Sequence, residues 1–537
     1  MAKQTNQRNS AAYLSNEWAE MKNAKIIWDG LLTDVYKYCD PNKKDMYSDT
    51  RGEDQFFELF DTSAIHYAEL LASALHSMLT NPSVQWFELT TGIPELDKKP
   101  EVRDFLQKTV RKIHQILNNS NFQTEIHSLY LDLAVAGTGV LRIEKDDTNK
   151  IRFSAKPIHK YGIKENSVGL VDTVYQEYEL TIRQAKQEFG EDFHVGSIKL
   201  TNLVNAGKDE EKITILHAVM PRKDAKFGKL DPKNKAIASQ HVFIDGENSK
   251  MLKEEGFDTF PYAVPRWIKA SGEIRGRSPS MKCLPDVKML NQIMKTTIRS
   301  AQKIVDPPLM FPDDMKLRPN TRPGGGNPYR AGRPDDRIYP LVTGGRIDLG
   351  LELMNAVRDR IKESYFIDQL QLREGPQMTA TEVNQRTEEH LRLLGPILGR
   401  LHFELLQPMI ARVMDILKED LPEAPEELAK ISPEIYFSSQ IARAQRIGEA
   451  QSLDRFMQTM EGLVQIDPTI YDLLATEDYV AYNANLFGVP QEIFRDEEGV
   501  KQIREQRAQQ QQEQQQRDAA QQESETVKNV AGMGPQA

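Results

Sequence analysis

The sequence has few cysteines, no long apolar run and no excess of positive charge. Only Cys39 and Cys283 occur among its 537 residues, too few for a disulfide framework or a cysteine-based zinc site, so a reducing cytoplasmic origin is expected. No stretch of about eighteen consecutive apolar residues occurs, and the opening residues lead into no apolar segment. The sequence therefore predicts a soluble, globular protein without a secretory signal, a transmembrane span or a membrane partner.

The charge balance excludes one way of handling nucleic acid. The chain has 69 Lys and Arg against 79 Asp and Glu, which gives a net charge of 69 − 79 = −10. A protein that coats nucleic acid gains its affinity by neutralising phosphates with Lys and Arg, so a coat is not expected. The same charge is compatible with a protein that DNA slides past.

The signatures of common enzymes are also absent. There is no GxxxxGK[ST] phosphate loop, no HExxH, no GxSxG and no paired CxxC, and no two histidines stand four residues apart. A DNA-packaging ATPase would need the phosphate loop. Gly137-Thr-Gly139 precedes a strand-like run, whereas a dinucleotide fingerprint precedes a helix, so it is interpreted as a turn. The chain is expected to be no enzyme, with no catalytic residues, metal or cofactor.

Two periodicities divide the first half of the chain. Apolar residues at three- and four-residue spacing predict a helix that begins at Asp61 or Thr62 and ends at Asn81-Pro82, and further helices near 96–118 and 122–136. Residues 140–269 are rich in β-forming segments separated by turns, with one helix expected over 181–189. The fold class expected is α+β, mainly helical.

A helical hairpin is the clearest architectural signal. One apolar stripe after Pro285 predicts a helix to residue 305, and a second stripe at i+4 spacing predicts a helix over 348–370. The first stripe consists of Val287, Leu290, Met294, Ile298, Ala301 and Val305, and the second of Leu353, Val357, Ile361 and Tyr365. About forty residues rich in Pro, Gly and Arg separate the two helices. Each helix would be about 30 Å long, enough to span a thick wall.

Basic residues cluster on this hairpin. Four cations share one face of the first helix: Lys288, Lys295, Arg299 and Lys303. The segment between the helices carries Arg318, Arg322, Arg330, Arg333 and Arg337. A charged helix face alone is typical of a solvated surface. On a projecting hairpin, however, spaced cations can contact phosphates without base specificity, so this face is a candidate DNA contact.

The rest of the chain is predicted as a connector, a kinked helix and a tail. Gly375 in the break at 371–378 would permit motion, and Gln371 and Arg373 could touch a passing polyanion. Thr379 and Glu382 have the spacing of a capping box for a helix to about residue 418, with kinks at prolines 396 and 408. Its predicted stripe is Leu391, Leu394, Leu398, Leu401, Leu405, Met409, Val413 and Ile416. Residues 501–522 hold eleven glutamines, typical of a mobile segment or of a helix supported by neighbouring copies.

Three further motifs occur in order along the chain. The first is Phe60-Asp-Thr-Ser-Ala64 with Leu71-Ala-Ser-Ala-Leu75, Asn81-Pro82 and Trp86-Phe87. The second is Gly276-Arg-Ser-Pro279 with Leu284-Pro-Asp286, Leu290-Asn291 and Asp306-Pro-Pro308. The third is Met378-Thr-Ala-Thr-Glu-Val383 with Gln385-Arg386. In this order the motifs resemble those of the head-to-tail connector, or portal, proteins of short-tailed bacteriophages, and the resemblance spans about residues 60–420.

The resemblance implies a ring of identical subunits, commonly twelve, with named parts along a channel. By position these are a wing (1–280), a stem (281–305 and 348–370), a clip (306–347), a tunnel loop (371–378), a long kinked wing or crown helix (379–420), a crown (421–500) and a C-terminal helical barrel or tail (501–537). Twelve copies would carry 12 × −10 = −120 charges. A largely acidic channel repels DNA and prevents it from sticking, while a few basic positions contact it.

The same resemblance implies the site and the partners. The channel candidates are Lys288, Lys295, Arg299, Lys303, Gln371 and Arg373, and the arginines of the clip are candidates for docking. Expected partners are other copies of the chain, double-stranded DNA, the packaging terminase, a tail adaptor, and capsid and scaffolding proteins. The protein would be assembled in the host cytoplasm and reside in the virion. A different virion ring protein, such as an adaptor, and a DNA-processing enzyme are the alternatives.

Overall fold

The structure is a computed structural model that divides into two compact units, Met1–Ile441 and Ala442–Ala537. The described residues of the first unit are 11–43, 58–97, 99–222, 225, 231–311, 319–327, 338–341, 347–370, 394–422, 424–425, 428 and 433–437. Those of the second unit are 455–460, which are helical, and 479, 503, 506, 507, 509 and 510. The clip arginines other than Arg322, the connector at 371–378 and most of the crown and tail lie outside the described residues.

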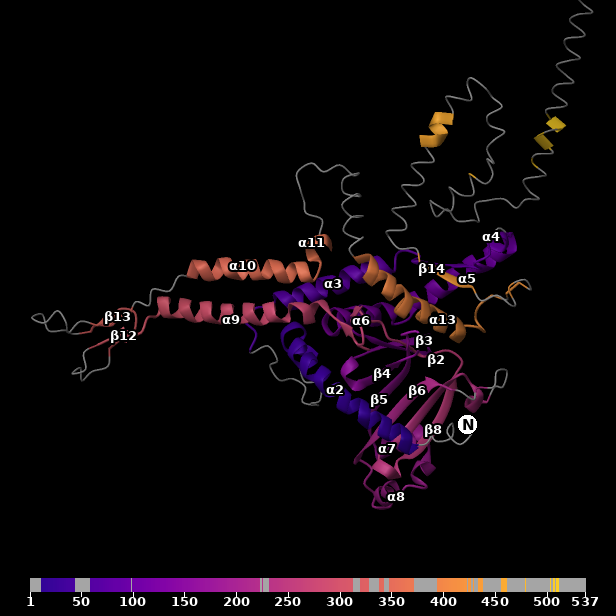
Figure 1. Ribbon diagram of the computed structural model, residues 1–537, viewed down its shortest axis with the longest axis horizontal. Coiled ribbons are helices and arrows are strands. Elements are labelled where there is room, and N and C mark those ends of the chain that lie inside the picture. Colours follow the sequence, from indigo (N-terminus) through magenta and orange to yellow (C-terminus); the bar gives the residue numbers. More distant parts are fainter. Residues whose placement is uncertain are drawn as a thin grey trace, which may run out of the picture. The chain divides into compact units, whose positions relative to one another are not determined.

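The first part of the chain is helical, as predicted (Figure 1). Its helices are α2 (Ala11–Cys39), α3 (Ser63–Leu79), α4 (Pro94–Asp97), α5 (Pro100–Asn119) and α6 (Phe122–Ala136), with a 3₁₀ turn at Pro41–Lys43. The predicted start of α3 is confirmed, since Asp61 Oδ1 accepts a hydrogen bond from the Ser63 N–H at 2.9 Å. The strand β1 (Phe87–Thr90) comes after α3 and pairs with β14 (Glu434–Phe437).

The turn at Gly137 is confirmed and has a steric reason. Gly137 ends α6 with φ +73°, a conformation that favours glycine. A Cβ at this position would lie 2.5 Å from the Gly276 carbonyl oxygen, so no side chain fits. The motif therefore joins α6 closely to the strand β11 (Gly276–Arg277), which pairs with β10 (Ile268–Lys269).

Residues 140–269 form two antiparallel sheets, as the β-rich pattern predicts. The smaller sheet has the order β3-β2-β9, from Lys150–Lys156, Val140–Asp146 and Tyr262–Ala263. The larger sheet has the order β4-β5-β6-β7-β8, from Tyr161–Glu165, Val171–Thr181, Lys212–Pro221, Ile237–Phe243 and Lys250–Phe257. Helix α2 lies against one face of the larger sheet, and α7 (Ile182–Phe189) and α8 (Ile198–Asn205) pack with the other. The predicted helix at 181–189 is confirmed, and Thr181 and Gln184 form its capping box.

Two histidines stack inside the larger sheet. The rings of His217 and His241 are 4.2 Å apart and nearly parallel at 5°. His217 hydrogen-bonds Ser239 Oγ at 2.9 Å, and His241 Nδ1 hydrogen-bonds the Tyr178 hydroxyl at 3.0 Å. Burial lowers the pKa of His241 to about 4 and, with the neighbouring ring, lowers the pKa of His217 well below its usual value.

This pair predicts acid sensitivity of the larger sheet. In the unfolded chain the two imidazoles become protonated below about pH 6.5, whereas in the folded chain they stay neutral to lower pH. The free energy of unfolding therefore falls as the pH drops from 6.5 to 4. For His241 the loss is about 3 kcal/mol across that window. His241→Gln should show a smaller drop in melting temperature than wild type between pH 7.5 and 4.5 by calorimetry. His66→Gln, on the exposed face of α3, should keep the wild-type drop. Equal drops in wild type and His241→Gln would contradict the prediction.

Candidate functional site: the two-helix stem

Helix α9 (Pro279–Val305) and helix α10 (Ile347–Ser364) form the predicted hairpin (Figure 1). Ser278 caps α9, its Oγ accepting a hydrogen bond from the Met281 N–H at 2.9 Å, so α9 begins two residues before the expected boundary at 281. Asp306-Pro-Pro308 ends α9, as predicted. The helices run antiparallel and close together, since a Cβ at Gly350 would lie 3.0 Å from Thr297 Oγ1.

The apolar stripe of α10 differs from the prediction at one end. Val357, Ile361 and Tyr365 are fully buried, but Leu353 is 48% exposed and Met354 is buried in its place. Steps of four residues advance by about 40° beyond a full turn, so three such steps place Leu353 about 120° from Tyr365, whereas Met354 lies at an angle between those of Ile361 and Tyr365. The second helix is also shorter than predicted, because Phe366 has φ +60° and separates α10 from α11 (Ile367–Leu370).

The root of the stem is buried against α2 and α6. The two cysteines, distant in sequence, are both buried there; the Cys283 thiol donates to the Ser280 carbonyl oxygen at 3.7 Å, and Tyr365 OH lies 2.6 Å from Ser280 Oγ. Burial raises the pKa of Cys39 to about 11 and that of Cys283 to about 12, so both are neutral thiols. This packing fixes the direction in which the hairpin leaves the wing.

The four cations of the predicted basic face have different surroundings. Lys288 pairs with Asp34 at 2.7 Å, and the Lys295 ammonium lies 5.4 Å from the centre of the Phe60 ring. Both side chains therefore contact the N-terminal part of the chain. Arg299 and Lys303 are exposed on the distal half of α9, with no ion-pair partner among the described residues. The periodicity of the sequence correctly placed the four on one side of a helix, but the tertiary contacts divide them into two pairs.

The tip of the hairpin is partly described. β12 (Leu309–Met310) pairs with β13 (Tyr339–Pro340), which closes the two helices into one projection. Within 319–327, the Asn327 side chain bonds both backbone groups of Asn320: its Oδ1 accepts from the Asn320 N–H at 2.6 Å and its Nδ2 donates to the Asn320 carbonyl at 2.9 Å. Arg322 is exposed. Arg318, Arg330, Arg333 and Arg337 lie outside the described residues, as do Gln371 and Arg373.

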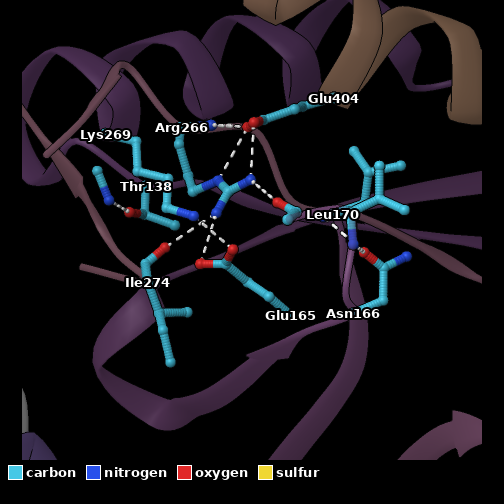
Figure 2. Close-up of polar contacts among 11 residues, drawn as sticks. Thr138, Glu165, Asn166, Leu170, Arg266, Lys269, Ile274 and Glu404 are labelled. Atoms are coloured by element: carbon cyan, nitrogen blue, oxygen red, sulfur yellow. Dashed lines mark hydrogen bonds and ion pairs between the residues drawn. The ribbon is translucent and has the colours of Figure 1, made fainter. Parts of the chain in front are cut away.

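A buried arginine, which no sequence pattern indicated, joins the β-rich region to the helical segment that comes after α10 and α11. Arg266 is 1% exposed, and its guanidinium donates from Nε and Nη2 to Glu404 at 3.0 and 2.7 Å (Figure 2). Its remaining donors reach Glu165 and the carbonyl oxygens of Gly169 and Ile274. Four of the five guanidinium donors are therefore hydrogen-bonded, and Nη1 also forms an ion pair with Glu165 Oε1 at 3.1 Å. Lys269 pairs with Glu165 at 2.5 Å, so this cluster, called here the Arg266 hub, has two cations and two carboxylates.

The helix that carries Glu404 changes type along its length. Residues 394–401 are α-helical, His402–Leu406 form a π-helical turn, and α13 (Gln407–Ile416) comes next. The π-helical turn lies directly before Pro408, where a kink is predicted. The predicted stripe is right from Leu394 through Val413, but the next fully buried residue is Leu417, four residues after Val413, rather than Ile416. Residues 379–393 lie outside the described part.

Two other kinds of site are absent among the described residues. No group of three or more His, Cys, Asp and Glu side chains there could hold a metal ion. None of the described helices combines the length and apolarity that crossing a bilayer requires.

Comparisons with known proteins give a matching family and several similar proteins. A family described as bacteriophage head to tail connecting protein matches residues 11–494. The chain is 31% identical over 523 residues to a probable portal protein of Bordetella phage BPP-1, covering 95% of this chain and 92% of that one. It is 29% identical over 538 residues to the portal protein of Salmonella phage epsilon15, covering 98% and 96%. A chain in a solved virion of a native gene transfer agent particle covers 79% of this chain and 88% of its own at 9% identity, with a TM-score of 0.37.

Proposed function

The chain belongs to the bacteriophage head to tail connecting proteins, a family of virion components, and we propose that its copies close into a ring through which DNA enters and leaves the capsid. In this proposal the ring occupies one capsid vertex and acts without catalysis. The observation that carries it is the match to portal proteins over nearly the whole chain, together with a stem whose distal half has exposed apolar and basic residues.

Apolar side chains on two sides of the stem support ring formation. Near the root, Asp61 pairs with Arg358 of α10 and the Phe60 N–H donates to Asn291 of α9, so the Phe60–Asp61 segment covers one side of the hairpin. Further out on that side, Val305 is 85% exposed, and Leu353 on the other side is 48% exposed. Different faces that meet head to tail generate a closed ring when the rotation closes. Exposed apolar patches of this kind mark protein contacts.

Placing a carboxylate on either apolar side should therefore prevent ring closure. We expect Val305→Asp and Leu353→Asp to shift the protein from rings to monomers or short arcs, because a buried unpaired carboxylate costs several kcal/mol per contact. Gln302→Asp, an exposed polar position of α9, should still form rings. Analytical ultracentrifugation and negative-stain imaging measure this. Intact rings in both apolar variants would contradict the assigned contact.

The acidic charge and the two distal cations support passage of DNA without tight binding. The net charge of −10 per copy keeps a DNA duplex from adhering to the ring. Arg299 and Lys303 can make spaced phosphate contacts, because no described residue pairs with them, whereas Lys288 and Lys295 contact the chain itself. The proposal includes Gln371 and Arg373 as further channel contacts.

The hairpin tip is proposed as the docking surface for the packaging terminase and later for a tail adaptor. Arg322 is its described cation, and the other clip arginines belong to the same segment. Imaging of the purified protein tests the function as a whole: a ring with a central pore, commonly twelvefold, supports it. A monomer with ATPase or nuclease activity would contradict it and favour a DNA-processing enzyme.

A further inference from the structure

The π-helical turn at His402–Leu406 has an identifiable cause. The Gln407 N–H donates to the His402 carbonyl, five residues back rather than four. Pro408 comes directly after it, and proline lacks an N–H and clashes with the carbonyl four residues before it. That carbonyl belongs to Glu404, so the widened turn lies where Pro408 would otherwise disrupt an α-helix.

The turn inserts one extra residue between two well-packed helix segments. Leu401 before it and Ile410 after it are both fully buried, and within the turn Leu405 and Leu406 are both fully buried as well. In a regular α-helix, adjacent residues point about 100° apart. The extra residue is therefore what allows the segments 394–401 and 407–416 to present their apolar sides to the core at the same time.

Polar and aromatic contacts from distant parts of the chain hold the turn. In the Arg266 hub, the Glu404 carboxylate accepts hydrogen bonds from the Arg266 guanidinium and, at 3.0 Å, from the Arg266 backbone N–H (Figure 2). The His402 ring stacks on Phe437 of β14 at 5.0 Å and 14°. α13 has its own anchor, since Arg412 donates to Asp415 and to Thr259 Oγ1.

We propose that the π-helical turn is a register switch and that the Arg266 hub is its latch. In the latched state Glu404 bonds Arg266 and the extra residue stays at 402–406. When Glu404 leaves Arg266, the extra residue moves along the helix, and residues 394–401 rotate by up to about 100° and shift by about 1.5 Å. Arg412 keeps α13 in place during this change.

The hub is built so that it survives release of Glu404. Arg266 would keep its contacts to Glu165 and to the carbonyl oxygens of Gly169 and Ile274, and Lys269 would stay with Glu165. The cation is then still paired, so opening the latch leaves no isolated buried positive charge. The inference goes beyond the proposed function and does not depend on it.

Hydrogen exchange of the purified full-length protein tests the switch. In Glu404→Gln the shape is kept but the charge-assisted bonds are lost, so exchange of the amides of 402–407 should rise about tenfold. Amides of α6 should not change. Glu273→Gln, the same substitution in the half-exposed pair with Arg277, is the matched control and should leave 402–407 as in wild type.

Deletion of Phe403 provides the second arm. Phe403 is 53% exposed in the π turn. When it is deleted together with Pro408→Ala, which removes the clash with the Glu404 carbonyl, the turn should become α-helix, the melting temperature should stay near that of wild type and exchange at 402–407 should be suppressed. Deletion of Gly399, in the α-helical part, should instead misplace residues 394–398 and lower the melting temperature. Unchanged exchange in Glu404→Gln, or a rise shared by α6, would overturn the switch. So would a Phe403 deletion with Pro408→Ala as destabilising as the deletion of Gly399; if that variant fails to fold, the Glu404→Gln result decides.

Discussion

Arg266→Ala is expected to lower the free energy of unfolding of the larger unit by about 3–5 kcal/mol, among the largest single effects in this chain. The substitution leaves Glu404 and Glu165 facing each other in a buried site with only Lys269 to compensate them. It also leaves the carbonyl oxygens of Gly169 and Ile274 without this donor. Calorimetry would show the loss as a lower melting temperature.

The comparison for this experiment is Arg277→Ala. Arg277 also has a carboxylate partner, Glu273, at 2.5 Å, but its side chain is 46% exposed. Exposed pairs contribute about 0–1 kcal/mol, so its melting temperature should stay near that of wild type. A double variant Arg266→Leu and Glu404→Leu should recover part of the loss, because neither charge is then left unpaired. Equal melting temperatures for Arg266→Ala and Arg277→Ala would show that the hub contributes little.

Reversing the two distal cations of the stem should abolish most DNA packaging without affecting the fold. In Arg299→Glu with Lys303→Glu, each copy changes by four charge units, and a ring of twelve would place dozens of added negative charges around the DNA. We expect at least about a tenfold fall in packaged or retained DNA, with the melting temperature unchanged because both side chains are exposed.

The control variant is Lys282→Glu, which changes an exposed cation near the root of the same helix. It should form rings and package DNA as wild type does. Rings must be confirmed by imaging in every variant, since a lost ring would also stop packaging. Normal packaging by the double variant in intact rings would exclude these cations as DNA contacts, while the ring itself would remain supported.

Local periodicity explains how much of the fold and of the candidate site could be predicted. The helices near 96–118 and 122–136 and the hairpin are set by apolar spacing, and the turn at Gly137 is set by its glycines. Errors arose where regular spacing was extended too far. Leu353 lies off the buried face of α10, and Leu417 rather than Ile416 is the buried residue that follows Val413.

The sequence by itself determined the connector family, the two-helix stem and the acidic charge. Motifs and apolar spacing depend only on residues that are near each other in the chain, and the net charge depends only on the amino-acid composition. Only the tertiary structure decided which charges are available. Lys288 pairs with Asp34, 254 positions away, and Glu404 pairs with Arg266, 138 positions away. Pairings at such separations depend on how whole elements pack, and no local pattern encodes that packing.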